Sequence, residues 1–105
     1  MQLTGKDRRF LRALGNPLKP TVMIGRDGPN EAVLAAIDDA HRTAELVKVR
    51  VLDTCDLHRR EVAEQLDRDS RSVVVQLLGR TILLYRRHPE KPRISLPSAP
   101  VAGTS

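Results

Sequence analysis

The sequence of 105 residues has few aromatic residues, one cysteine and no long apolar run. Phe10 and Tyr85 are its only aromatic residues, which argues against a protein that grips single strands by stacking bases on several rings. Cys55 has no second cysteine to pair with, so folding needs no oxidising compartment. No apolar segment approaches the ~20 residues of a membrane-spanning helix, and residues 1–5 do not resemble a signal peptide. We therefore expect one folded domain in the cytoplasm.

Patterns typical of catalysis and metal binding are also scarce. Cys55 and His58 lie three residues apart, but no second cysteine or histidine pair completes a zinc site. Asp38 and Asp39 are adjacent, so on a helix they do not face each other as two catalytic carboxylates would. We find no nucleophile beside a base at a recognisable spacing. We predict a protein that is not an enzyme and has no metal or cofactor.

The chain does carry basic charge, and that charge is unevenly distributed along a sequence with a formal net charge of +5. Residues 1–30 contain six Lys or Arg against two Asp or Glu, residues 31–70 contain six against ten, and residues 71–105 contain six against one. If the two basic ends meet in space, the fold has a basic face and an acidic back. A basic face favours a polyanionic partner. A basic surface that only maintains solubility is the alternative.

The most informative local pattern is an apolar strand at residues 21–24 followed by Gly25, Arg26, Asp27 and Gly28. The two glycines permit a tight reversal of the chain, and Asn30 is a favourable N-cap for a following helix. Such a loop presents backbone N–H groups and the Arg26 side chain at an exposed edge, where a nucleic-acid backbone can approach. KH domains clamp nucleotides with a GXXG loop in this manner, although glycine turns also occur in loops of every kind.

Hydrophobic periodicity predicts helices over residues 4–15, 30–43 and 56–69, with Thr4, Asn30 and Asp56 as N-caps. Strands are predicted at residues 21–24, 46–51, 72–78 and 81–86, the last two joined by a type II′ turn at Gly79-Arg80. This order predicts an α/β fold, α-β-α-β-α-β-β, with a mixed four-stranded sheet, three helices and a core mainly on one face. Residues 1–97 form the predicted domain, and residues 98–105 a disordered tail.

The first predicted helix separates apolar from basic residues. Phe10, Leu11 and Leu14 fall on one side, which we expect to face the core, and Gly15 is expected at the C′ position that ends the helix. Its arginines, Arg8, Arg9 and Arg12, fall on another side. Like charges one turn apart destabilise an isolated helix by a few tenths of a kcal/mol per pair. Either an anionic partner or solvent is expected to face these arginines.

Short motifs resemble the YhbY family, and they lie at residues 18–20 (Leu-Lys-Pro), 24–28 (Ile-Gly-Arg-Asp-Gly), 31 with 33–34, 46–49, 75–81, 84–86 and 93–97. This family is the bacterial stand-alone form of the CRM (chloroplast RNA splicing and ribosome maturation) domain, and the resemblance spans residues 3–97. Two departures stand out. Pro29-Asn30 follows the loop where the family usually has Leu-Thr, and residues 69–71 lack the glycine that often ends the third helix.

The resemblance implies an RNA-binding protein that associates with ribosomal RNA of large-subunit precursors and assists ribosome assembly. The implied fold is that of the C-terminal domain of translation initiation factor three. The expected RNA-binding residues are Gly25, Arg26, Asp27, Gly28, Lys19, Arg8, Arg12, Lys48 and Arg80. We expect a monomer whose partners are structured ribosomal RNA and ribosomal proteins, with no membrane. The alternative is a protein-interaction module, which would dock on a ribosomal protein or assembly factor through its acidic middle or an unpaired strand edge.

Overall fold

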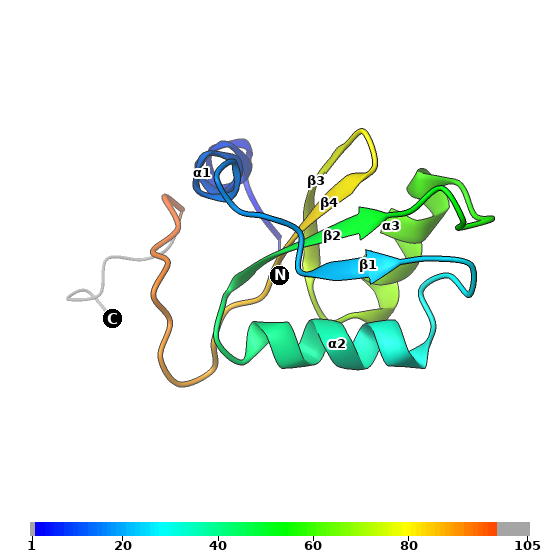
Figure 1. Cartoon of the computed structure of the whole chain (residues 1–105). Helices are drawn as coiled ribbons and strands as arrows, with labels where there is room; N and C mark the ends of the chain where they lie inside the picture. The colour runs from blue at the N-terminus through cyan, green and yellow to red at the C-terminus, as the bar shows by residue number, and fades with distance from the viewer. Residues whose placement is uncertain (1, 99–105) are drawn as a thin grey trace.

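Seven helices and strands, in the predicted order, make up the computed structural model, which describes residues 2–98. They are α1 (Gly5–Gly15), β1 (Val22–Ile24), α2 (Glu31–His41), β2 (Leu46–Val51), α3 (Arg59–Asp69), β3 (Val73–Leu78) and β4 (Thr81–Tyr85). The strands form one sheet, with α2 and α3 on one face and α1 on the other (Figure 1). The predicted α/β fold is confirmed. Across residues 2–98 no helix is long and apolar enough to cross a membrane.

The strands are arranged in the order β1-β2-β4-β3. Strands β1 and β2 are parallel, whereas β4 is antiparallel to both β2 and β3. At the β3–β4 turn Gly79 has a φ of +58° and Arg80 does not have a positive φ, as a type II′ turn requires. This topology brings the carboxyl ends of β1 and β2 and the β3–β4 turn to the same end of the sheet (Figure 1).

The hydrophobic core occupies both faces of the sheet, because successive side chains of a strand point to opposite sides. Val47, Val49 and Val51 of β2 lie in the larger cluster, which includes residues of α2 and α3. Leu46 lies in a smaller cluster with Leu11 of α1. The larger cluster agrees with the expected core on one face, and the smaller one was not predicted. By the same alternation, the basic residues of β2 point to the α1 side.

Helix α1 faces the sheet with a different side from the one predicted. Its buried residues are Asp7, Leu11 and Gly15, whereas Phe10 and Leu14 are exposed. Gly15 is the last helical residue and not the C′ residue, since the C-cap is Asn16 in a right-handed conformation. A Cβ atom on Gly15 would lie 2.7 Å from a Leu83 methyl carbon. Glycine at this position therefore allows α1 to approach the sheet closely.

Two of the three predicted N-caps are confirmed, and the third is wrong. Thr4 forms a capping box with Asp7, and the Asn30 side chain accepts a hydrogen bond from Val33 N at 3.0 Å. The third helix is capped by His58, whose Nδ1 accepts from Arg60 N, and not by Asp56. Histidine is not among the preferred N-cap residues, which are Asn, Asp, Ser, Thr and Gly. The known N-cap preferences therefore led to the wrong prediction of the nearby Asp56.

The departure from the family pattern at residues 69–71 has a visible structural result. Helix α3 ends at Asp69, and Arg71 follows with a φ of +59°. Among residues 2–98 it is the only residue other than glycine with a positive φ. This left-handed conformation costs an L-residue with a Cβ roughly 1–2 kcal/mol, so the chain tolerates local strain where a glycine would have none.

Arg71→Gly is expected to stabilise the protein by about 0.5–1 kcal/mol, because the relieved strain exceeds the extra unfolded-state entropy of glycine. Equilibrium unfolding in urea measures the change. Arg71→Ala is the matched control, since alanine retains the strain while removing the guanidinium. If both variants gained equally, charge repulsion and not backbone strain would limit stability at this position.

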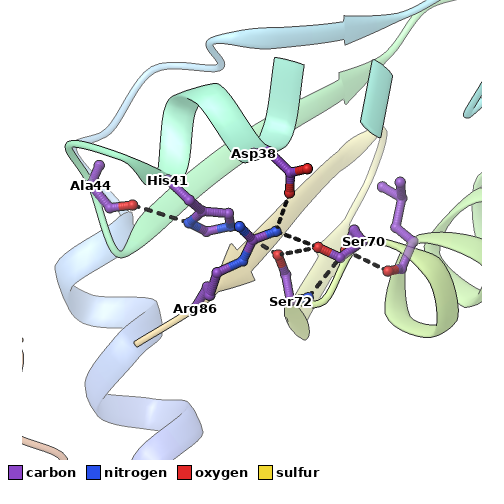
Figure 2. A network of polar contacts seen from close by, with 7 residues as sticks. Asp38, His41, Ala44, Ser70, Ser72 and Arg86 are labelled. Carbon is purple, nitrogen blue, oxygen red and sulfur yellow. Dashed lines mark hydrogen bonds and ion pairs between the residues drawn. The ribbon is translucent and has the colours of Figure 1, made fainter. Parts of the chain in front are cut away.

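A polar network joins the end of α2 to the α3–β3 connection and to the residue after β4 (Figure 2). His41 Nε2 lies 2.9 Å from Ser72 Oγ, and His41 Nδ1 lies 3.0 Å from Ala44 O. Burial lowers the pKa of His41, so the ring stays neutral at physiological pH. Arg86 Nη2 donates to Asp38 Oδ1 at 2.6 Å and also to Ser70 O. These contacts hold the α3–β3 connection against the end of α2 and the residue after β4.

The C-terminal segment is held by two buried carboxylates. Glu45 accepts three backbone hydrogen bonds, from His88 N at 3.0 Å, Arg93 N at 2.6 Å and Ile94 N at 2.8 Å. Burial by itself raises the pKa of Glu45, but these three donors outweigh it and the pKa lies below its ordinary value. Asp7 accepts from Ser98 N at 3.0 Å. Ser98, which we expected to begin a disordered tail, is therefore bonded to the domain, and residues 99–105 lie outside the described residues.

Candidate nucleic-acid interface

The Gly25–Gly28 loop forms a tight turn between β1 and α2. Gly28 N donates to Gly25 O at 3.0 Å, and Asn30 N donates to Gly28 O at 2.9 Å. Gly28 has a φ of +67°, a conformation that a side chain would strain. The side chains of Arg26 and Asp27 are exposed. The turn therefore presents one guanidinium and one carboxylate to solvent, next to the N-terminus of α2.

Glycine at position 25 is favoured for a different reason, which is that the backbone there lies close to a neighbouring segment. A Cβ atom on Gly25 would lie 3.3 Å from Thr54 Oγ1. Leu52 N donates to Ile24 O at 2.8 Å, so the chain after β2 continues alongside the end of β1. The loop at residues 25–28 thus packs against residues 52–58, which connect β2 to α3.

Arg80 reaches the same end of the sheet from the β3–β4 turn. Its carbonyl accepts from Val51 N at 2.8 Å, and its Nη1 lies 2.6 Å from Asp53 Oδ1. These side chains are 51% and 91% exposed, and a pair this exposed contributes little to stability. Asp53 therefore holds the Arg80 side chain only weakly. The carboxylates of Asp27, Asp53 and Asp56 nevertheless make this end less basic than the sequence predicted.

The uncovered part of the sheet face extends from this end toward α1. Lys48 and Arg50 lie on the same side of β2 as Leu46, which packs under α1. Lys48 Nζ donates to Asn16 O at 3.3 Å, and Lys48 lines a cavity of about 450 Å³ together with Lys19. The structure therefore brings Lys19 and Lys48 together beside one cavity, whose lining also includes Asp39 and other residues of α2.

Two exposed residues beside the loop were missing from the predicted site. Met23 and Arg50 are paired across β1 and β2, and both are exposed. The alternation of Lys48 and Arg50 with buried valines contained the signal for Arg50. No sequence signal marked Met23, because an exposed methionine in a three-residue strand looks like a core residue.

Arg8 does not lie with the loop. Its Nη1 donates to Val74 O at 2.9 Å and to Val75 O at 3.2 Å, where the pairing of β3 with β4 is irregular. These atoms are at the end of the sheet opposite to the loop. Arg12 is half-buried in the last turn of α1. A role for Arg8 and Arg12 in binding RNA stays a prediction, and Arg8 has a structural role in addition.

The charges of the three helices fit a basic face with an acidic back, although Arg86 of the basic C-terminal part bonds to Asp38 of α2 on the opposite face. Helix α1 contains four basic residues and one acidic residue, which is buried, whereas α2 contains three acidic residues and no lysine or arginine. Helix α3 has more acidic than basic residues. Because α1 lies on one face of the sheet and α2 and α3 on the other (Figure 1), positive charge predominates on the α1 side.

The model of the CRS1 / YhbY (CRM) domain family matches residues 3–86. The chain belongs to the CRM family. The Bacillus subtilis protein named "Probable RNA-binding protein YqeI" is 42% identical over 95 residues, which are 90% of this chain and 99% of that protein. A Haemophilus influenzae protein named "RNA-binding protein" is 35% identical over 95 residues, or 90% of this chain and 95% of that protein.

The fold of this CRM domain is also similar to that of a solved structure. The solution structure of the hypothetical protein SAV1595 from Staphylococcus aureus matches with a TM-score of 0.78 at 41% identity, covering 91% of this chain and all of that one. The resemblance to the YhbY family is thus confirmed. The family match includes the Gly25–Gly28 loop and all four strands. The segment after Arg86, which Glu45 and Asp7 hold, lies beyond the residues matched.

Proposed function

We propose that this CRM domain binds RNA in the cytoplasm, as a monomer without catalytic activity, and assists assembly of the large ribosomal subunit. The names of its bacterial relatives support RNA as the ligand. The observation that carries the proposal is the exposed Arg26 in a glycine-bounded turn, placed at the edge of a basic sheet face. The backbone N–H groups of Arg26 and Asp27, which the turn does not use, would hydrogen-bond phosphate or sugar, and the Arg26 side chain would contact phosphate.

The few aromatic residues decide between two modes of RNA recognition. Tyr85 is buried and Phe10 is exposed, and the sequence has no other Phe, Tyr or Trp. Base stacking on several rings is therefore not available. Arginine and lysine contacts to phosphates suit a structured RNA that is recognised by its shape. Ribosomal RNA in a large-subunit precursor has this property.

Arg26→Glu is expected to weaken RNA binding and to reduce the salt dependence of the affinity by about one phosphate contact, a change of 0.7–0.9 in slope. Fluorescence anisotropy with a fragment of ribosomal RNA at several salt concentrations measures both quantities. The melting temperature should be nearly unchanged, since the side chain is exposed. Arg60→Glu is the matched control, because Arg60 is an exposed arginine of α3 on the other face.

Equal loss of affinity in the two variants would mean that only net charge matters and that the loop has no special role. A flat dependence of affinity on salt would contradict the phosphate mechanism altogether. If neither variant altered RNA binding, the alternative of a protein-interaction module would be favoured. Crosslinking in cells, followed by sequencing of the attached RNA, tests the ribosomal target, and reads without enrichment for ribosomal RNA would contradict it.

A further inference from the structure

A second basic site lies at the end of the sheet opposite to the Gly25–Gly28 loop. A cavity of about 690 Å³ opens there between the N-terminal segment, the start of β3 and the end of β4. Four arginines line it, and Asp67 is its one lining carboxylate. They come from three parts of the chain and are Arg8, Arg71, Arg86 and Arg87. Four guanidinium groups against one lining carboxylate leave an excess of positive charge around the cavity, which favours an anion.

The four arginines divide into two that are fixed and two that are free. Arg8 is held by two carbonyl oxygens of β3, and Arg86 by Asp38 and Ser70 O (Figure 2). Arg71 and Arg87 are exposed, and neither side chain has a hydrogen bond or ion pair within the described residues. The fixed pair builds the wall of the cavity, and the free pair can close on a ligand.

One of the four arginines also has a buried donor without a partner. Arg86 Nε is buried and has no acceptor among residues 2–98. A buried donor without an acceptor is unusual in folded proteins and needs an explanation. Asp67 is already engaged, because its Oδ1 accepts from Val74 N at 3.0 Å. With four guanidinium groups and one carboxylate among its lining residues, the cavity favours a ligand that supplies negatively charged oxygens.

We propose that this cavity binds a phosphate group of an RNA strand, as a second contact point separate from the loop. The proposal rests on the proposed function. Guanidinium groups match phosphate oxygens in bidentate geometry, and no ring is available in the cavity to stack a base, since Tyr85 is buried. Strand β2 has six residues, so the two ends of the sheet are roughly 20 Å apart. An RNA that contacts both sites must span this distance.

The test follows backbone amides and arginine Nε–H groups by NMR during titration with a short RNA duplex and, separately, with inorganic phosphate. RNA is expected to shift the amides of Ser72 and Val73 and the Nε–H of Arg86, together with the amides of residues 25–28. The double variant Arg71→Gly, Arg87→Gln should lose about tenfold in RNA affinity. The control Arg42→Gln, Arg60→Gln removes two exposed arginines outside the cavity and should lose much less.

The outcomes separate the two proposals. RNA shifts at residues 25–28 with none at the cavity, or equal affinity losses in the two double variants, would overturn the second site and leave the proposed function standing. Shifts at the cavity alone would support the second site and contradict the role of the loop. Shifts with inorganic phosphate but not with RNA would assign the cavity to a free anion and overturn its role in RNA binding.

Discussion

Glu45→Ala is expected to lower the free energy of unfolding by about 3 kcal/mol, since it removes a charged acceptor from three backbone donors. The segment from His88 to Ile94 should then detach, exposing the smaller core cluster beneath it. Urea denaturation measures the loss, and hydrogen exchange of the three amides locates it. Glu64→Ala, at an exposed position of α3, is the control and should change stability by less than about 0.5 kcal/mol.

The same carboxylate predicts a dependence on pH. Because the folded-state pKa of Glu45 lies below its ordinary value of 4.5, the stabilisation is complete above pH 4.5. It is lost as the pH falls through the folded-state pKa. Above pH 4.5 the difference in stability between the wild-type protein and Glu45→Ala should be constant, and it should shrink in more acidic solution. A difference that did not shrink would mean that the charge of Glu45 is unimportant.

Gly15→Val is expected to destabilise the protein by about 2 kcal/mol, because the added atoms overpack the contact between α1 and the sheet. The nearest atoms belong to Leu83, which is buried and has little room to move. Thermal unfolding measures the effect. Gly5→Ala is the control at the other end of α1, where an added Cβ would have nothing within 4 Å. If both variants were equally stable, the contact between Gly15 and Leu83 would not limit how closely α1 packs on the sheet.

Local sequence patterns predicted most of the fold because the strands of this protein have clear alternation and its turns have characteristic residues. Val47, Val49 and Val51 indicated β2, and Gly79 indicated the turn between β3 and β4. The order of strands within the sheet was not predictable in this way. It depends on how the hairpin of β3 and β4 docks against β2, and that is decided by contacts between residues far apart in the sequence.

The candidate site was predicted in part for the same reason. The loop at residues 25–28 is local, so its glycines and Arg26 identified it. The residues that pair with a charged side chain can lie far away in the sequence. The Arg80–Asp53 pair and the attachment of Arg8 to β3 therefore could not be predicted from local patterns. Gly15 illustrates a related error. Its position suggested the end of a helix, but the reason for glycine there is a contact with Leu83, which lies far along the chain.

The attachment of Arg8 has a consequence for association between chains. Strand β3 lies at an edge of the sheet, and exposed edges invite pairing with another strand. Here Val74 N is occupied by Asp67, and the carbonyls of Val74 and Val75 are occupied by Arg8. An incoming peptide would have to displace a carboxylate and a guanidinium to pair with β3 at Val74 and Val75. These two side chains thus hinder β-augmentation at this part of the edge strand.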